Sequence, residues 1–210
     1  MNIVFEDAHV VVCEKEAGVA SERSPDGNDM VTLLLAGGRK EIFPVHRLDT
    51  ATTGLMVYAK TKRAAAFLSK EIAEDRFSKE YAALVHGVPA EPEGTWEDLL
   101  YRDKQKNKSY VVKRERKGVK TAKLSYAVRS TKTTDKGVFS LVRVKLYTGR
   151  THQIRVQFAS RRLPLAGDGK YGANDNIKKL GLKCVKLAFV HPEIGEPLTF
   201  EISDDMEHVL

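Results

Sequence analysis

Apolar and polar residues alternate, or apolar residues run together, in many short stretches of the chain. Near the start, Ile3–Phe5 and His9–Cys13 predict two strands separated by an acidic turn. The uninterrupted apolar run Leu55–Ala59 predicts a buried strand. Further strands are predicted at residues 79–87, 122–128, 138–147, 185–190 and 198–202. The last two flank HPEIGEP, a sequence with two prolines and a glycine, and therefore predict a hairpin.

Helical periodicity predicts two helices. Behind Thr61, which is a suitable N-cap, Ala64, Leu68 and Ile72 recur every fourth residue and predict a helix to about residue 74. A second helix is predicted to begin after Thr151 and to run to about residue 162. Many strands, few helices and short connections predict an α+β domain with mostly antiparallel pairing. A doubly wound nucleotide-binding fold is excluded, because no glycine-rich phosphate loop follows the first strand.

Length and composition indicate a soluble globular protein. The 210 residues suit one well-packed domain, and 42% of them are hydrophobic and 30% charged. No stretch approaches the roughly 18 apolar residues that a transmembrane helix needs, and the N-terminus lacks the positive charge of a signal peptide. Cys13 and Cys184 lie far apart in apolar surroundings, which is typical of buried thiols in a reducing compartment. We therefore expect a cytoplasmic protein.

The charge distribution points to a polyanionic partner. The net charge is +7, and the stretch Arg102–Lys120 alone holds nine basic and two acidic residues. We call Arg102–Lys120 the basic segment. Clusters of Lys and Arg contact nucleic-acid phosphates and release condensed counterions. A solvated excursion of the chain explains the same charges equally well, and charge alone does not choose between the two.

An aspartate stands at the entrance to the predicted buried strand. Asp49 lies in HRLDTATTG, residues 46–54, where backbone amides and hydroxyl groups can hold a carboxylate rigidly. A lone aspartate in such a place is more often a turn-former. A second group of polar residues far downstream makes Asp49 a candidate for chemistry.

That second group is TGRTHQIR, residues 148–155, which places three strong hydrogen-bond donors at a strand-to-helix junction. In a helix that begins after Thr151, His152 and Arg155 lie three residues apart on one face. The dipole at a helix start favours negative charge, so an arginine there requires an anion nearby. Asp49 is a candidate for that anion.

Tyr81 stands in a third stretch, residues 79–87. A tyrosine at a strand start can offer a ring face and a hydroxyl together, although a half-buried core tyrosine is the plainer interpretation. Together the three stretches resemble the motifs of the RluA-type RNA pseudouridine synthases, in the family's order. The motifs here read HRLDTATTGLMVYAK, KEYAALVHG and TGRTHQIRVQFASRRLPLAGDGKYG.

The resemblance implies roles for four residues. Asp49 matches the catalytic carboxylate, and Tyr81 matches the residue that packs on the target base and can assist proton removal. Arg155 matches the arginine that pairs with the catalytic aspartate, and Arg47 matches one that fills the gap left when the base flips out of the RNA. The carboxylate can attack the sugar, add to the base or remove a sugar proton, and the sequence does not choose among these routes.

The resemblance also implies the fold and the partners. It implies a single mixed, mostly antiparallel β-sheet catalytic domain with a few flanking helices over residues 1–210. We expect no separate N-terminal RNA-binding domain, because strand-like sequence begins at Ile3. The implied reaction isomerises uridine in a structured ribosomal or transfer RNA without cofactor or metal, and the six histidines lack ligand spacing. We expect a monomer that binds RNA and no membrane.

Two other functions are weighed against this one. A non-catalytic RNA-binding module explains the basic segment, but it does not explain an acidic residue among the donors of an RNA-facing surface, where it repels phosphate. A small-nucleotide enzyme would need a glycine-rich phosphate-binding loop, and the sequence contains none.

Overall fold

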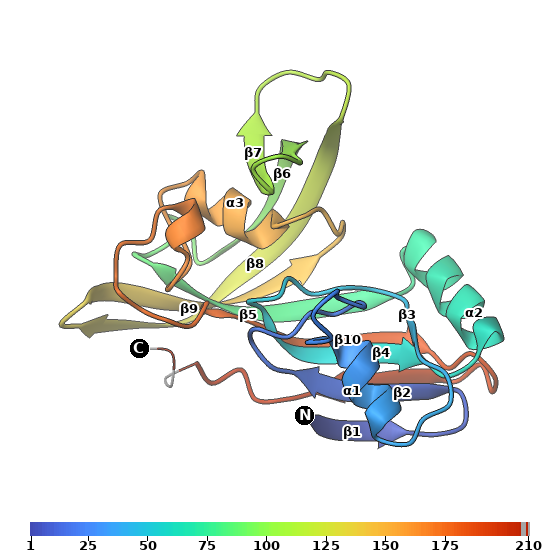
Figure 1. The fold of residues 1–210 in the computed structure, drawn as a ribbon. Coiled ribbons are helices and arrows are strands. Elements are labelled where there is room, and N and C mark those ends of the chain that lie inside the picture. The colour runs from blue at the N-terminus through green and yellow to red at the C-terminus, as the bar shows by residue number, and fades with distance from the viewer. Residues whose placement is uncertain (207–208, 210) are drawn as a thin grey trace. The chain divides into compact units, whose positions relative to one another are not determined.

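The computed structural model describes residues 1–206 and 209. Within them the chain forms eleven strands, three α-helices and one short 3-10 helix (Figure 1). The strand pairing is mixed and mostly antiparallel, which confirms the fold class predicted from the sequence. The chain divides into two compact units. Unit 1 comprises residues 1–79 and 183–203, and unit 2 comprises residues 80–182 and 204–210.

Unit 1 is built on the strand β4 (Thr53–Ala59), which is apolar and buried from Gly54 onward. Such a continuous apolar run is typical of a strand covered on both faces. β4 pairs antiparallel with β2 (Val10–Lys15) and parallel with β10 (Leu182–Val190). The remaining strands of unit 1 are β1 (Asn2–Glu6) beside β2, β3 (Phe43–Pro44) beside β4, and β11 (Pro197–Glu201) beside β10.

Two helices belong to unit 1. The helix α2 (Lys62–Ala73) begins as predicted at Thr61, whose hydroxyl accepts a hydrogen bond from the Ala64 amide. The helix α1 (Met30–Ala36) was not predicted. Its N-cap is Asp29, whose carboxylate accepts a hydrogen bond from the Thr32 amide at 2.7 Å.

Gly54 allows β4 and β10 to approach each other. It has a φ of +106°, and a Cβ at this position would overlap the backbone of Cys184, its partner in β10. Only glycine satisfies both the positive φ and the close approach. The glycine that ends HRLDTATTG is therefore required by the pairing of β4 with β10.

Unit 2 contains five neighbouring strands of the eleven-stranded sheet, in the order β5-β9-β8-β6-β7. Its elements are β5 (Ser78–His86), β6 (Glu93–Asp103), β7 (Lys108–Val112), β8 (Val119–Thr134), β9 (Gly137–Leu146), the helix α3 (Gln153–Ala159) and the 3-10 helix η1 (Gly169–Tyr171). The pairs β6–β7, β6–β8 and β8–β9 are all antiparallel.

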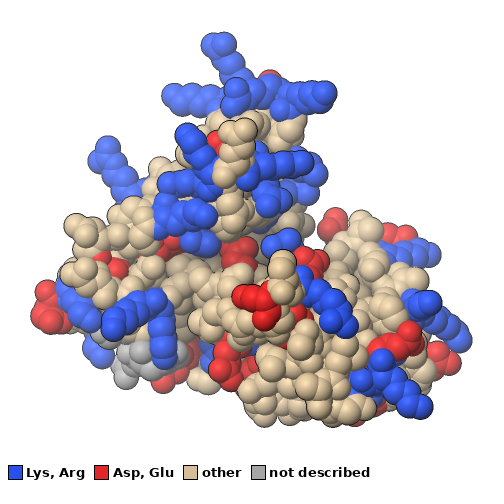
Figure 2. Space-filling model, in the orientation of Figure 1, with Lys and Arg blue, Asp and Glu red and all other residues tan. Residues whose placement is uncertain are grey.

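The basic segment forms the end of β6, all of β7 and the loop that leads into β8. Figure 2 shows that Lys and Arg side chains gather over this end of the sheet. On one face of these strands, Leu100 and Ala122 are buried against Val156 of α3. The segment is therefore part of the folded sheet, and its charges lie on a structured surface.

Most sequence predictions of individual elements are confirmed, but the prediction for α3 was wrong at both ends. Thr151 does not cap this helix. His152 occupies the N-cap position with a φ of 54° and no side-chain capping bond. The helix ends at Ala159, and Arg162 with a φ of 63° lies in the left-handed region that a right-handed helix cannot include. The strands β6 and β7 were also not predicted.

Candidate active site

The segment that carries Asp49 is tied to the body of unit 1 on both sides of the carboxylate. On one side, the backbone of Leu48 exchanges two hydrogen bonds with the hydroxyl of Ser21, at 2.8 and 3.0 Å. On the other side, the Thr52 amide donates to the Asp49 carbonyl at 2.9 Å and closes a turn. Asp49 itself is half-buried. The backbone that presents this carboxylate is thus fixed within one residue in each direction.

A buried lysine provides a further anchor for this turn. Lys15, which is 1% exposed, donates hydrogen bonds to the carbonyls of Glu16, Val19 and Thr50 at 2.8–3.0 Å. Burial lowers the pKa of Lys15 to about 8, while the negative charge of Asp49 acts in the opposite direction. Lys15 therefore holds the residue that follows Asp49 and places a positive charge in the electrostatic environment of the carboxylate.

His46 anchors the start of the same motif. Its ring is buried, and Nε2 accepts a hydrogen bond from the Val57 amide of β4 at 3.1 Å. Burial, and to a smaller extent the charge of Lys79, lowers the pKa of His46 well below its usual range. His46 is consequently neutral, and it serves to fix the chain rather than to carry charge.

Arg47 differs from His46 and Leu48, the buried residues on either side of it, because its side chain is exposed. It makes a long ion pair with Glu22 at 3.5 Å, and both side chains are more than half exposed. Exposed pairs of this kind contribute little to stability. The guanidinium of Arg47 can therefore exchange Glu22 for another anion at small cost.

The other two predicted site residues belong to unit 2. Tyr81 lies in β5 and is 5% exposed. Arg155 lies in α3 and is 7% exposed. That these two residues and the pair Asp49 and Arg47 form one site stays a prediction.

Arg155 has a partner that the sequence did not reveal. Its Nε and Nη2 donate to the two carboxylate oxygens of Asp168 at 2.7 and 2.8 Å. Asp168 is 1% exposed, so this is a buried, bidentate ion pair. A guanidinium held in this way has a fixed plane.

Tyr171 supports the same arginine from a second direction. The Arg155 guanidinium lies 5.1 Å from the centre of the Tyr171 ring. The Tyr171 hydroxyl accepts a hydrogen bond from the Ser109 amide of β7 at 2.8 Å and contacts Nδ1 of His152 at 2.9 Å. Arg155 and the first residues of β7 are thus connected through one tyrosine.

Asp168 and Tyr171 were both present in the third sequence motif, within AGDGKYG. The aspartate between two glycines looks like a turn-former, and a single tyrosine gives no periodic signal. Their contacts with Arg155 depend on the path of the chain after α3, which no local pattern specifies.

Within residues 1–206 and 209, no three His, Cys, Asp or Glu side chains are grouped so that they could hold a metal ion. In the same part of the chain, no helix is long and apolar enough to cross a membrane.

Comparison with known proteins gives a consistent result. Residues 9–160 match the family model described as RNA pseudouridylate synthase. The chain is 32% identical to the dual-specificity RNA pseudouridine synthase RluA of Yersinia pestis, over 96% of this chain and 98% of that protein. It is 35% identical to the ribosomal large subunit pseudouridine synthase D of Neisseria meningitidis, over 100% of this chain and 60% of that protein.

A solved structure agrees in fold. Human RNA Pseudouridylate Synthase Domain Containing 1 is similar to this chain with a TM-score of 0.81 and 24% identity, over 96% of this chain and 82% of that one. At this identity the similarity concerns the fold alone.

Proposed function

The chain belongs to the family of RNA pseudouridine synthases, which are isomerases, and we propose that it converts uridine to pseudouridine in a structured ribosomal or transfer RNA. Relatives are named for the ribosomal large subunit and for dual specificity, which supports this choice of substrate. In this proposal, residues 1–210 form one catalytic domain, and the protein acts as a monomer in the cytoplasm.

The reaction breaks the bond between the sugar and a ring nitrogen, rotates the uracil and joins the sugar to a ring carbon. It is an isomerisation, so every atom and electron of the product comes from the substrate, and we propose that it proceeds without a cofactor. Asp49 is the proposed catalytic carboxylate. It attacks the anomeric carbon, adds to the ring or removes a sugar proton, and each route requires its ionised form.

The observation that carries the proposal is the fixed position of Asp49. Hydrogen bonds from Ser21 to Leu48 and from Lys15 to Thr50 hold the chain on either side of this carboxylate. A catalytic group held in this way needs no reorganisation when the substrate arrives.

The target uridine must leave its stack before the carboxylate can reach it, which costs a few kcal/mol. In the proposed mechanism, the ring of Tyr81 packs on the flipped uracil, and the exposed Arg47 fills the gap in the RNA. The buried Arg155, oriented by Asp168, pairs with Asp49. These three residues are proposed to bind substrate and to position the carboxylate.

The decisive experiment maps pseudouridines in the RNA of cells with and without this protein. We expect one or a few uridines in ribosomal or transfer RNA to be unmodified in its absence. Re-expression of the unaltered protein should restore them, whereas re-expression of Asp49→Asn at the same level should not. If Asp49→Asn restores the modification, Asp49 is not the catalytic carboxylate. If the two RNA populations are identical, the proposed function fails.

A further inference from the structure

The strands β6, β7 and β8 have a second face that differs from the one packed on α3. In antiparallel pairs, residues directly opposite each other share a face, and alternate residues along a strand do so too. The register pairs Tyr101 with both Tyr110 and Val119, and it pairs Leu99 with both Val112 and Thr121. We call the face formed by these residues the outer face: Leu99, Tyr101, Tyr110, Val112, Val119 and Thr121.

The two faces are buried to very different extents. On the α3 side, Leu100 is 4% and Ala122 is 0% exposed. On the outer face, Tyr110 is 37% exposed, and Leu99, Tyr101 and Val119 are half-buried. Aromatic and aliphatic residues therefore gather on a surface that the fold leaves open to solvent.

Cations lie over the rings of the outer face. The Arg116 guanidinium is 4.5 Å from the centre of the Tyr101 ring. Nζ of Lys108 lies between two rings, 5.9 Å from the centre of Tyr110 and 5.1 Å from the centre of Tyr171. The arrangement continues toward β9, where Nζ of Lys123 and of Lys145 lie 5.9 and 5.5 Å from the ring of Tyr147, which is 43% exposed. Aromatic rings interleaved with basic side chains are typical of surfaces that bind single-stranded nucleic acid.

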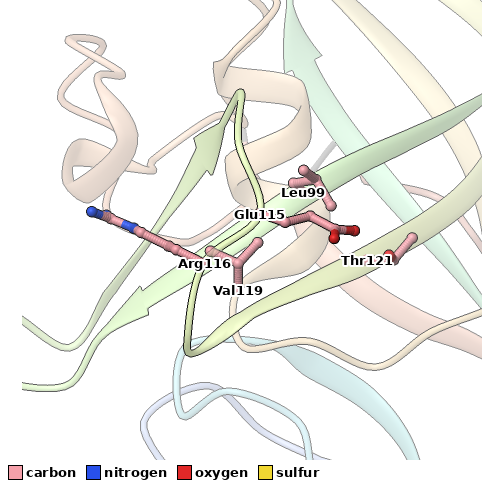
Figure 3. Close-up of a pocket in the computed structure, with 5 residues that line it drawn as sticks. All are labelled: Leu99, Glu115, Arg116, Val119 and Thr121. Atoms are coloured by element: carbon pink, nitrogen blue, oxygen red, sulfur yellow. The ribbon is translucent and has the colours of Figure 1, made fainter.

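A cavity of about 410 Å³ opens on this face, between β6, β8 and the loop that joins β7 to β8. Leu99, Val119 and Thr121 line its strand side, and Glu115 and Arg116 line its loop side. In Figure 3 the Glu115 carboxylate extends across the cavity toward Thr121, whereas the Arg116 side chain extends the other way. The cavity thus combines two aliphatic side chains with a hydroxyl, a carboxylate and a guanidinium.

We propose that the outer face binds a single-stranded part of the RNA substrate and that the cavity receives one unpaired base bearing an exocyclic amino group. This proposal rests on the RNA substrate proposed above. The side chains of Leu99 and Val119, together with the rings of Tyr101 and Tyr110, suit the flat faces of bases. The surrounding lysines and arginines suit the phosphates, and their excess of seven positive charges disfavours a basic peptide.

Glu115 specifies the kind of base. A carboxylate repels phosphate and only accepts hydrogen bonds, so it suits the amino group of cytosine, adenine or guanine. Uracil presents a carbonyl oxygen at the position where cytosine presents an amino group. The cavity should therefore distinguish cytosine from uracil, two bases of nearly equal shape.

The test compares two short, fluorescently labelled single-stranded RNA oligonucleotides, one of uridines alone and one with a single central cytidine. Binding is measured by anisotropy in the Asp49→Asn background, so that no uridine is isomerised during the titration. We expect the cytidine probe to bind about tenfold more tightly, as for a hydrogen bond to a charged group. Glu115→Ala should remove this preference. Glu97→Ala is the matched control, because it removes an exposed carboxylate of β6 that pairs with Lys123, and it should keep the preference.

A second measurement addresses stacking. Tyr110→Ala should weaken binding of both probes roughly 5- to 150-fold, the range for loss of one stacked base, without changing the salt dependence. Tyr110→Phe, which keeps the ring, should restore the affinity. Thermal unfolding of each variant checks that the fold is intact.

Two results overturn the inference. Equal affinity of the unaltered surface for both probes would show that the cavity does not select a base. An unchanged affinity in Tyr110→Ala would show that Tyr110 does not stack on one. Neither result touches the proposed function, which is tested separately by tritium release from uridine in the natural RNA. If that assay shows no isomerisation while the probes behave as expected, the surface binds RNA and the proposed function fails.

Discussion

The segment around Asp49 and the basic segment are both polar, but the fold treats them in opposite ways. The Asp49 segment is held by Ser21, Lys15 and His46, all of which are buried. The basic segment lies at the end of a sheet, and the lysines of its turn, Lys104 and Lys106, are exposed. One region fixes a single functional group, and the other spreads many charges over a surface.

This difference follows from the physics of the two tasks. A catalytic carboxylate must meet the reacting atom within a fraction of an ångström, so the chain that carries it has to be rigid. Attraction between basic side chains and phosphates acts over a Debye length of roughly 10 Å and tolerates movement. Substitutions in the first region should therefore affect turnover, and substitutions in the second should affect affinity.

The largest effect is expected for Asp49→Asn. The amide keeps the shape of the side chain but is neither a nucleophile nor a base, so turnover should fall at least about 10³-fold. The measurement is tritium release from RNA that carries uridine labelled at the fifth ring carbon. Affinity for the RNA and the unfolding temperature should stay close to those of the unaltered protein.

Asp135→Asn is the control for this substitution. Asp135 is exposed in the turn between β8 and β9, so the same chemical change there should leave tritium release unaffected. Appreciable turnover by Asp49→Asn would remove this residue from its proposed role.

Arg155→Lys should also reduce turnover strongly, but less than Asp49→Asn does. Lysine keeps the charge but cannot bind both oxygens of Asp168 in one plane, so the position of the cation is no longer fixed. Turnover should fall by about 10²-fold if this arginine positions the catalytic carboxylate. Single-turnover rates at saturating RNA measure the effect on chemistry separately from binding.

Unit 2 contains a matched control for Arg155→Lys. Arg161 also binds both oxygens of one aspartate, Asp98, at 2.9 and 3.2 Å. Arg161→Lys should cost some stability and leave the single-turnover rate unchanged. Equal rates for the two variants would mean that Arg155 serves the structure or contacts phosphate.

Lys15 shows what could not be predicted from the sequence. Lysine is almost never fully buried, and no local pattern marks the three carbonyls that surround its ammonium group. The same holds for Asp168, which meets Arg155 only because the chain returns after α3. Asp49, in contrast, could be predicted as a site residue because its motif is continuous in sequence.

The helices and strands likewise include some that could be predicted from the sequence and some that could not. Strand β4 and helix α2 follow from uninterrupted apolarity and a four-residue period, and both were predicted. Strand β7 consists of lysine-flanked residues whose pairing depends on β6, and α1 is a seven-residue apolar run without a clear period. Such elements are determined by tertiary contacts rather than by local pattern.

The effect of Lys15→Met should lie between that of Arg155→Lys and that of substitutions in the basic segment. Methionine fills similar space but leaves the carbonyls of Glu16 and Val19 without their donor, so the protein should lose roughly 2–4 kcal/mol of unfolding free energy. Turnover should also fall, because Thr50 loses the same anchor beside Asp49. Lys62→Met, at an exposed position of α2, is the control and should be nearly neutral.

The pH dependence of Lys15→Met provides an independent check. The pKa of Lys15 is about 8 in the folded protein and near 10.5 for an unburied lysine. Between these values the unfolded chain binds more protons than the folded one, so Lys15 makes stability rise with pH. The difference in unfolding free energy between the unaltered protein and Lys15→Met should widen from pH 8 to pH 10. A constant difference, measured by urea unfolding, would place the pKa of Lys15 near its usual value.

The smallest effect on chemistry is expected in the basic segment. Replacing Lys104, Lys106 and Lys108 with Gln removes three charges around the turn between β6 and β7 and should weaken RNA binding. If each lysine meets one phosphate, the slope of log affinity against log salt should fall by roughly 0.7–0.9 per lysine. Turnover at saturating RNA should stay the same, because a uniform loss of binding raises KM and spares kcat. An unchanged salt slope would mean that these lysines contact water and not phosphate. The basic segment and the Asp49 segment would then differ in exposure alone.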